Sequence, residues 1–201
     1  MIKRIYISPS TQENNAGYGD YGTEEQRMHE IADIVVPELE RYGFEVYRGR
    51  KEQSLWDMIE ESNRLKVDIH VAIHSNAHDG KSRGCLALHY PGSIKGQALA
   101  TAIYNEVNAI SPADGRGFIV NRDYIEPRET IAPCAIIEVA FHDNPEDARW
   151  ILQNQKEIAM AIVRGILKYA GVAEEKPDYE KLYKGLVRDI NNLMNKYSLQ
   201  G

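Results

Sequence analysis

The chain has 201 residues, of which 43% are hydrophobic and 27% charged, a balance typical of a single globular domain with one core. A formal net charge of −6 argues against nucleic acid as a partner. No apolar run approaches the roughly 20 residues of a membrane span. The first residues lack the apolar core and cleavage site of a secretory signal peptide, so we expect synthesis in the cytoplasm.

The chain begins with a predicted strand, Ile2–Ser8, followed by a polar loop and a helix from about Glu24 to Arg41. Thr23 has the side chain of a helix N-cap, and apolar residues recur after it with the 3.6-residue period of an α-helix. A long polar loop after the first strand of an α/β sheet is a favoured place for the wall of a site. A second strand, Phe44–Tyr47, and a second helix from Ser54 follow.

The central strand is predicted where Ile69, Val71 and Ile73 alternate with smaller or polar residues. This strand ends at His74, directly before a polar loop over residues 75–80. Ligands of an open α/β sheet bind outside the carboxyl ends of its strands, so His74 is placed to bind a metal or to move a proton.

The rest of the first 172 residues continues the alternation of strands and helices. We expect a strand over Cys85–Tyr90, a helix over Ala98–Ile110, a short strand at Phe118–Val120 in an otherwise irregular segment 111–131, a strand over Ala135–Val139, a short helix from Pro145 and a helix over Ile158–Ala170. This alternation predicts an α/β fold, with a twisted, mostly parallel sheet and helices on both faces.

A charged linker at 173–178 separates this domain, residues 1–172, from a C-terminal segment, residues 173–201. A helical stripe of apolar side chains follows the linker and reaches about Tyr197; its members are Tyr179, Leu182, Leu186, Ile190 and Leu193. An isolated helix of this length is marginal in water, so the stripe needs a cover. Because it is shorter than three to four heptads, we expect it to pack on its own domain, with a homodimer through this helix as the alternative.

Three residues with metal-binding or proton-transfer chemistry fall at one edge of the predicted sheet. Glu24 follows the first loop, His74 ends the central strand and Glu138 lies near the end of the last strand. Zinc binds histidine and carboxylate side chains, and a catalytic zinc leaves one position for water. A further carboxylate nearby can act as a general base on that water, so the pattern indicates a zinc hydrolase.

Two motifs carry a resemblance to a known family. They are Ala-Ile-His-Ser-Asn-Ala at Ala72–Ala77, and Ile-Glu-Val-Ala-Phe at Ile137–Phe141 with Asn144 after it. Together with Glu24, they resemble the N-acetylmuramoyl-L-alanine amidases of the amidase-3 family over roughly residues 2–172. The resemblance implies a peptidoglycan hydrolase that uses zinc-activated water to cleave the amide bond between N-acetylmuramic acid and L-alanine of the stem peptide.

The resemblance also implies roles for individual residues. Glu24 and His74 would be zinc ligands and Glu138 the catalytic base. Asn76 and Arg128 are candidates for binding the muropeptide. As in endolysins, autolysins and sporulation enzymes, the target would be the bacterial cell wall, reached on lysis or during sporulation.

The first loop departs from the family pattern. The family's first histidine ligand should fall near Thr11, and this loop contains no histidine. His142 is the best candidate for the third ligand because it leaves the last strand at the same sheet edge, whereas His70 lies about 13 Å from His74 along the strand, too far to share a zinc. Two alternatives therefore stay open: a non-catalytic muropeptide-binding module on the same fold, and a zinc amidohydrolase of another small peptide.

Overall fold

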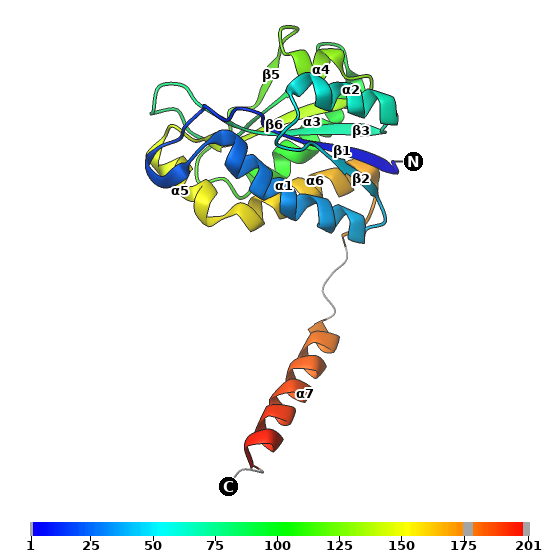
Figure 1. Cartoon of the computed structure of the whole chain (residues 1–201), viewed down its shortest axis with the longest axis vertical. Coiled ribbons are helices and arrows are strands. Elements are labelled where there is room, and N and C mark those ends of the chain that lie inside the picture. Colours follow the sequence, from blue (N-terminus) through cyan, green and yellow to red (C-terminus); the bar gives the residue numbers. More distant parts are fainter. Residues whose placement is uncertain (1, 175–178, 199–201) are drawn as a thin grey trace.

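Six strands form one sheet in the computed structural model, which describes residues 2–174 and 179–198 (Figure 1). They are β1 (Arg4–Pro9), β2 (Glu45–Arg48), β3 (Ile69–Asn76), β4 (Leu86–His89), β5 (Phe118–Val120) and β6 (Cys134–Phe141). Their order across the sheet is β2, β1, β3, β6, β4, β5. Strands β1, β2, β3 and β6 are parallel, whereas β4 is antiparallel to β6 and carries β5 parallel to itself. The predicted α/β fold with a mostly parallel sheet is confirmed.

Helices cover both faces of the sheet, as predicted. They are the 3-10 helix η1 (Gly19–Tyr21) and the α-helices α1 (Glu24–Arg41), α2 (Leu55–Leu65), α3 (Ile94–Asn108), α4 (Ile125–Glu129), α5 (Pro145–Gln153) and α6 (Gln155–Ala170), with α7 (Tyr179–Ser198) following the linker. Figure 1 shows α2 and α4 on one side of the sheet and α1 and α6 on the other. No helix in the described parts of the chain has both the length and the hydropathy of a membrane span.

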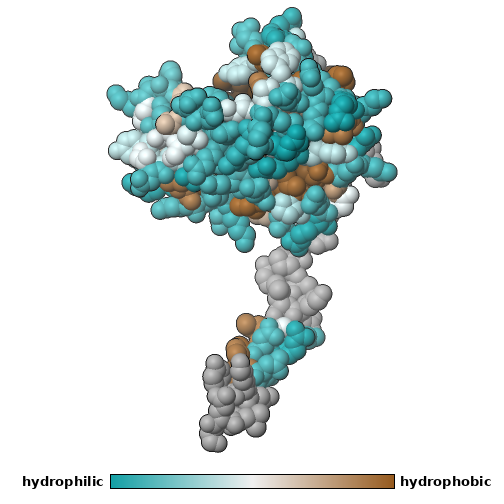
Figure 2. Space-filling view, in the orientation of Figure 1, coloured by the Kyte–Doolittle hydropathy of each residue, from teal (hydrophilic) through white to brown (hydrophobic). Residues whose placement is uncertain are grey.

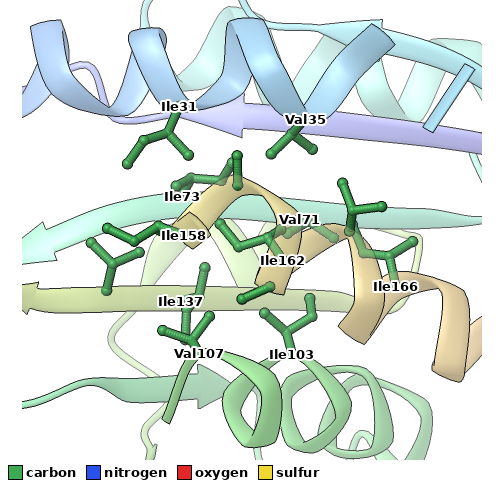
Figure 3. Close-up of a cluster of buried hydrophobic side chains, with 14 of the residues drawn as sticks. Ile31, Val35, Val71, Ile73, Ile103, Val107, Ile137, Ile158, Ile162 and Ile166 are labelled. Carbon is green, nitrogen blue, oxygen red and sulfur yellow. The ribbon is translucent and has the colours of Figure 1, made fainter. Parts of the chain in front are cut away.

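The main core lies between the sheet and helices α1, α3, α5 and α6. Branched aliphatic side chains from the sheet and these helices meet there (Figure 3); among them are Ile31, Val35, Val71, Ile73, Ile103, Val107, Ile137, Ile158, Ile162 and Ile166. Successive side chains of a strand point to opposite faces. The odd-numbered residues of β3 therefore enter this core, and His70 and His74 face the side covered by α2 and α4.

Two short helices lie where the sequence predicted irregular segments: η1 falls in the first polar loop, and α4 in the segment 111–131. Helix α4 buries Glu126 and Pro127. Five residues are too few for a hydrophobic period to appear in the sequence, so no pattern could predict this helix.

Helix α7 does not bury the described part of its apolar stripe. Leu186 is 59% exposed, Ile190 49% and Leu193 55%. Figure 2 shows the apolar side chains along one edge of α7, beside hydrophilic ones. The expectation that these three side chains pack on the domain is wrong, and the side chains of Tyr179 and Leu182 lie outside the described ones.

Candidate active site

Glu138 and His74 lie side by side at the carboxyl end of the sheet. Strands β3 and β6 are adjacent and parallel, and their register pairs His74 with Glu138. The register shifts between His74 and Asn76, an irregularity of the kind that often accompanies active sites. The sheet thus brings a histidine and a carboxylate together without help from a loop.

Glu24 reaches the same point from the first turn of α1. The Thr23 hydroxyl accepts a hydrogen bond from the Gln26 amide, which starts the helix as predicted. The Glu24 side chain is fully buried, and its Oε1 accepts from His74 Nδ1 at 2.8 Å. Its Oε2 accepts from the Asn15 side chain at 2.7 Å. Although burial opposes ionisation, the hydrogen bond from His74 lowers the pKa of Glu24.

His74 is surrounded by carboxylates. Besides Glu24, Glu126 of α4 places its Oε2 3.7 Å from His74 Nε2. Burial disfavours a charged imidazole, but Glu126, Glu24 and Glu138 outweigh it and raise the pKa of His74 well above its ordinary value. The three carboxylates around His74 therefore favour the charged form of its imidazole.

Glu138 has the properties of a proton acceptor near neutral pH. Its Oε2 is buried and has no hydrogen-bond partner among the described residues. Burial raises the pKa of Glu138 to about 7; the charge of Glu24 acts in the same direction, and the charge of His74 opposes both. Burial, and after it the charge of Glu138, raises the pKa of the Tyr124 phenol.

His142 is directed to another group of side chains. Its Nδ1 lies 2.9 Å from Ser75 Oγ, and its ring stacks on Tyr21 with centroids 5.4 Å apart. Ser75 follows His74 in β3, so the two side chains point to opposite faces of the sheet. The structure does not direct His142 at His74, and its buried Nε2 has no partner among the described residues.

The donors around His74 do not form a three-ligand metal site. Among the described residues, no three His, Cys, Asp or Glu side chains are arranged to hold a metal ion. Glu24 and His74 bond directly to each other, and Asn15 occupies the second oxygen of Glu24. Thr11 stands where the sequence comparison expected a histidine. The side chains present therefore do not fit the three protein ligands of a catalytic zinc.

The two predicted substrate contacts belong to elements that also carry site residues, Asn76 to β3 with His74 and Arg128 to α4 with Glu126. Asn76 is two residues beyond His74 in β3, and its Oδ1 accepts from the Ala77 amide at 2.8 Å. Arg128 extends from α4, where its Nε donates to Glu129 at 2.7 Å and its Nη1 donates to the Arg122 carbonyl at 3.4 Å.

Sequence reasoning missed Glu126, because its helix has no recognisable period. His70 also belongs to this region: its Nε2 donates to Glu126 Oε1 at 2.8 Å. The distance that separates His70 from His74 along the strand is thus bridged by a carboxylate. The signal that could have found it was a pair of histidines on one buried strand face, since buried imidazoles need polar partners.

Comparison with known proteins identifies a family. The model of the N-acetylmuramoyl-L-alanine amidase family matches residues 5–168. Amidase AmiC2 of Nostoc punctiforme is 25% identical to this chain, with a TM-score of 0.77 over 84% of this chain and 97% of that one. No curated protein matches the sequence.

Two further solved structures share the fold. The catalytic domain of the amidase CwlV from Bacillus (Paenibacillus) polymyxa var. colistinus is 20% identical, with a TM-score of 0.78 over 86% of this chain and all of that one. An N-acetylmuramoyl-L-alanine amidase from Clostridium difficile 630 is 22% identical, with a TM-score of 0.78 over 86% of this chain and 99% of that one.

Proposed function

This chain belongs to the N-acetylmuramoyl-L-alanine amidase family and is a peptidoglycan amidase, and we propose that Glu138 is its general base. The observation that carries this proposal is the position of Glu138 beside His74, with an oxygen that no described side chain engages. A pKa of about 7 suits a group that must accept and return a proton near neutral pH.

The reaction needs two proton transfers, and Glu138 can carry both. As a water oxygen attacks the carbonyl carbon of the lactyl amide, the Glu138 carboxylate takes the proton that the water loses. When the C–N bond breaks, Glu138 returns that proton to the departing nitrogen of L-alanine. The products are a lactyl carboxylate on the glycan and a stem peptide with a free amino terminus.

Members of this family are generally zinc-dependent, and a bound zinc polarises the amide carbonyl and activates water. In this chain Glu24 and His74 are the residues that would hold Zn²⁺, but the described donors supply no third ligand, so the proposed proton transfers do not depend on a metal. His142 as that ligand finds no support in its contacts with Ser75 and Tyr21.

We keep Asn76 and Arg128 as proposed contacts for the muropeptide. Asn76 lies next to the reacting end of β3, and the exposed Arg128 carries a positive charge suited to the carboxylates of a stem peptide. Family membership supports the bacterial cell wall as the place of action. Delivery from the cytoplasm on lysis or during sporulation stays a prediction.

A non-catalytic muropeptide-binding module is the second candidate, favoured by the missing histidine at Thr11. Incubating the purified chain with peptidoglycan, with a defined disaccharide-peptide and with a free peptide amide separates the alternatives. The amidase releases stem peptide from the first two substrates, a binding module retains them intact, and a general amidohydrolase cleaves all three. Mass spectrometry of each incubation identifies released stem peptide, intact substrate or cleaved peptide amide.

We further propose that residues 1–172 form the catalytic domain and that the helix in 173–201 pairs with a second copy of this chain. The described apolar residues Leu186, Ile190 and Leu193 are spaced by four and three positions, as in the seam of a coiled coil, and all are exposed. Pairing would give the enzyme two attachment points on a polymeric substrate.

A further inference from the structure

Glu126 is a buried carboxylate that the proposed proton transfers do not use. It is 3% exposed and belongs to α4, whose five residues cover one side of the site. Removing a carboxylate from water is costly unless charged or hydrogen-bonded partners compensate it. The partners of Glu126 therefore indicate what it does.

The two oxygens of Glu126 have different partners. Oε1 accepts from Ser8 Oγ at 2.5 Å and from His70 Nε2 at 2.8 Å, which anchors the carboxylate to β1 and β3. Oε2 faces His74 Nε2 at 3.7 Å. One oxygen is thus fixed to the sheet while the other is aimed at the histidine beside Glu138.

The anchor is itself held in place. His70 Nδ1 lies 2.9 Å from Ser62 Oγ of α2, and the His70 ring stacks on Tyr6 with centroids 5.1 Å apart. His70 is fully buried. With a partner at each ring nitrogen and Tyr6 on its face, the buried His70 ring is positioned to fix Glu126.

A line of polar contacts therefore runs from α2 to α1 through the site; its members are Ser62, His70, Glu126, His74 and Glu24. In this line His74 has a carboxylate at each ring nitrogen. Groups placed at both ring nitrogens fix how the ring is oriented.

We propose that Glu126 is a positioning residue of the amidase site: it holds His74 through Nε2, so that Nδ1 points at Glu24 and the ring stays beside Glu138. The proposal rests on the amidase function proposed above. Glu126 acts through His74 and does not itself touch the substrate. A merely structural alternative is that Glu126 only ties α4 to the sheet.

Glu126→Gln keeps the shape of the side chain and removes its charge. Glu129→Gln, three residues later in the same helix with its side chain 40% exposed, is the matched control. We expect Glu126→Gln to lower kcat on a disaccharide-peptide by about 10–100-fold, the size of loss typical when a group that orients a metal-binding histidine is removed. KM should change much less than kcat, because Glu126 does not touch the substrate. Glu126→Asp, which keeps the charge, should recover part of the loss.

A second readout does not depend on substrate. ¹⁵N NMR of the imidazole nitrogens, with His74 assigned from the spectrum of His74→Gln, should show its resonances displaced in Glu126→Gln and unmoved in Glu129→Gln. A lower melting temperature with unchanged kcat and unchanged His74 resonances would show a structural role only and overturn the proposal.

Ser8→Ala decides the matter if Glu126→Gln does not fold, because it removes one anchor and leaves the carboxylate. We expect displaced His74 resonances and a smaller loss of kcat; unmoved resonances would overturn the proposal. If the parent hydrolyses no peptidoglycan, the proposed function fails, and the NMR comparison still decides whether Glu126 positions His74.

Discussion

The side chains around His74 explain how a sheet edge becomes a reactive site. Three carboxylates converge there from α1, α4 and β6, each on an element whose own packing fixes it. Each charge alters its neighbours: the acidic groups raise the pKa of His74, and burial raises the pKa of Glu138 to about 7. The acid–base properties of the site therefore depend on how these side chains are placed relative to one another.

A substitution at Thr11 can test whether the missing histidine limits zinc binding by this chain. The loop that contains it packs against the start of α1, where the Glu24 amide donates to the Asn15 carbonyl at 2.9 Å. Thr11→His would restore the ligand type that the family resemblance expects. We predict that after dialysis against micromolar zinc this variant retains more metal per chain than the parent, as measured by plasma mass spectrometry. Thr11→Gln is the control of similar polarity, and equal zinc in all three proteins would contradict the prediction.

Glu138 should also make the stability of the fold depend on pH. Its pKa rises from an ordinary 4.5 to about 7 on folding, so the native state retains a proton that the unfolded chain releases between these values. The native protein is therefore destabilised by this group as pH rises through that window.

Glu138→Gln removes that dependence because the amide stays neutral. In metal-free buffer we predict a melting temperature above that of the parent at pH 8 and no difference at pH 4. Calorimetry or circular dichroism at the two pH values provides the measurement. A difference of the same size at both pH values would mean that the charge of Glu138 does not cause it.

In the single chain, the described apolar side chains of helix α7 are exposed. Such a helix gains most of its stability from packing that covers its apolar face. Pairing with a second copy would provide that cover.

Leu186→Asp places a charge in the middle of the stripe. We predict that the parent is a dimer by light scattering and that this variant is a monomer with unchanged activity per active site on a soluble disaccharide-peptide. Arg188→Asp, on the same helix with an exposed polar side chain, is the control and should remain a dimer. A monomeric parent would remove the pairing proposal.

At the scale of the whole molecule, the sequence patterns predicted most of the sheet and its flanking helices. Periods of 2 and 3.6 residues are properties of long buried elements, so β3, β6, α1 and α6 were recognisable. Side-chain placement at the carboxyl edge was also predictable for Glu24, His74 and Glu138, because strand ends meet there.

The remaining features depend on contacts between distant segments. Glu126 lies in a five-residue helix, and only the folded chain brings it between His70 and His74. His142 has the right sequence position for the His74 edge, yet Ser75 and Tyr21 bind it on the opposite face. A sequence pattern does not predict which way a loop side chain points, or which of two nearby groups it will contact.

The most direct test is the rate at which Glu138→Gln releases stem peptide from peptidoglycan. General-base groups typically contribute about 10²–10⁴-fold, so we predict a loss of this size, relative to the parent, in peptides bearing a new L-alanine amino terminus by mass spectrometry. The circular dichroism spectrum should stay that of the parent, because Gln keeps the shape of the side chain. Release at the parental rate would remove Glu138 from the mechanism.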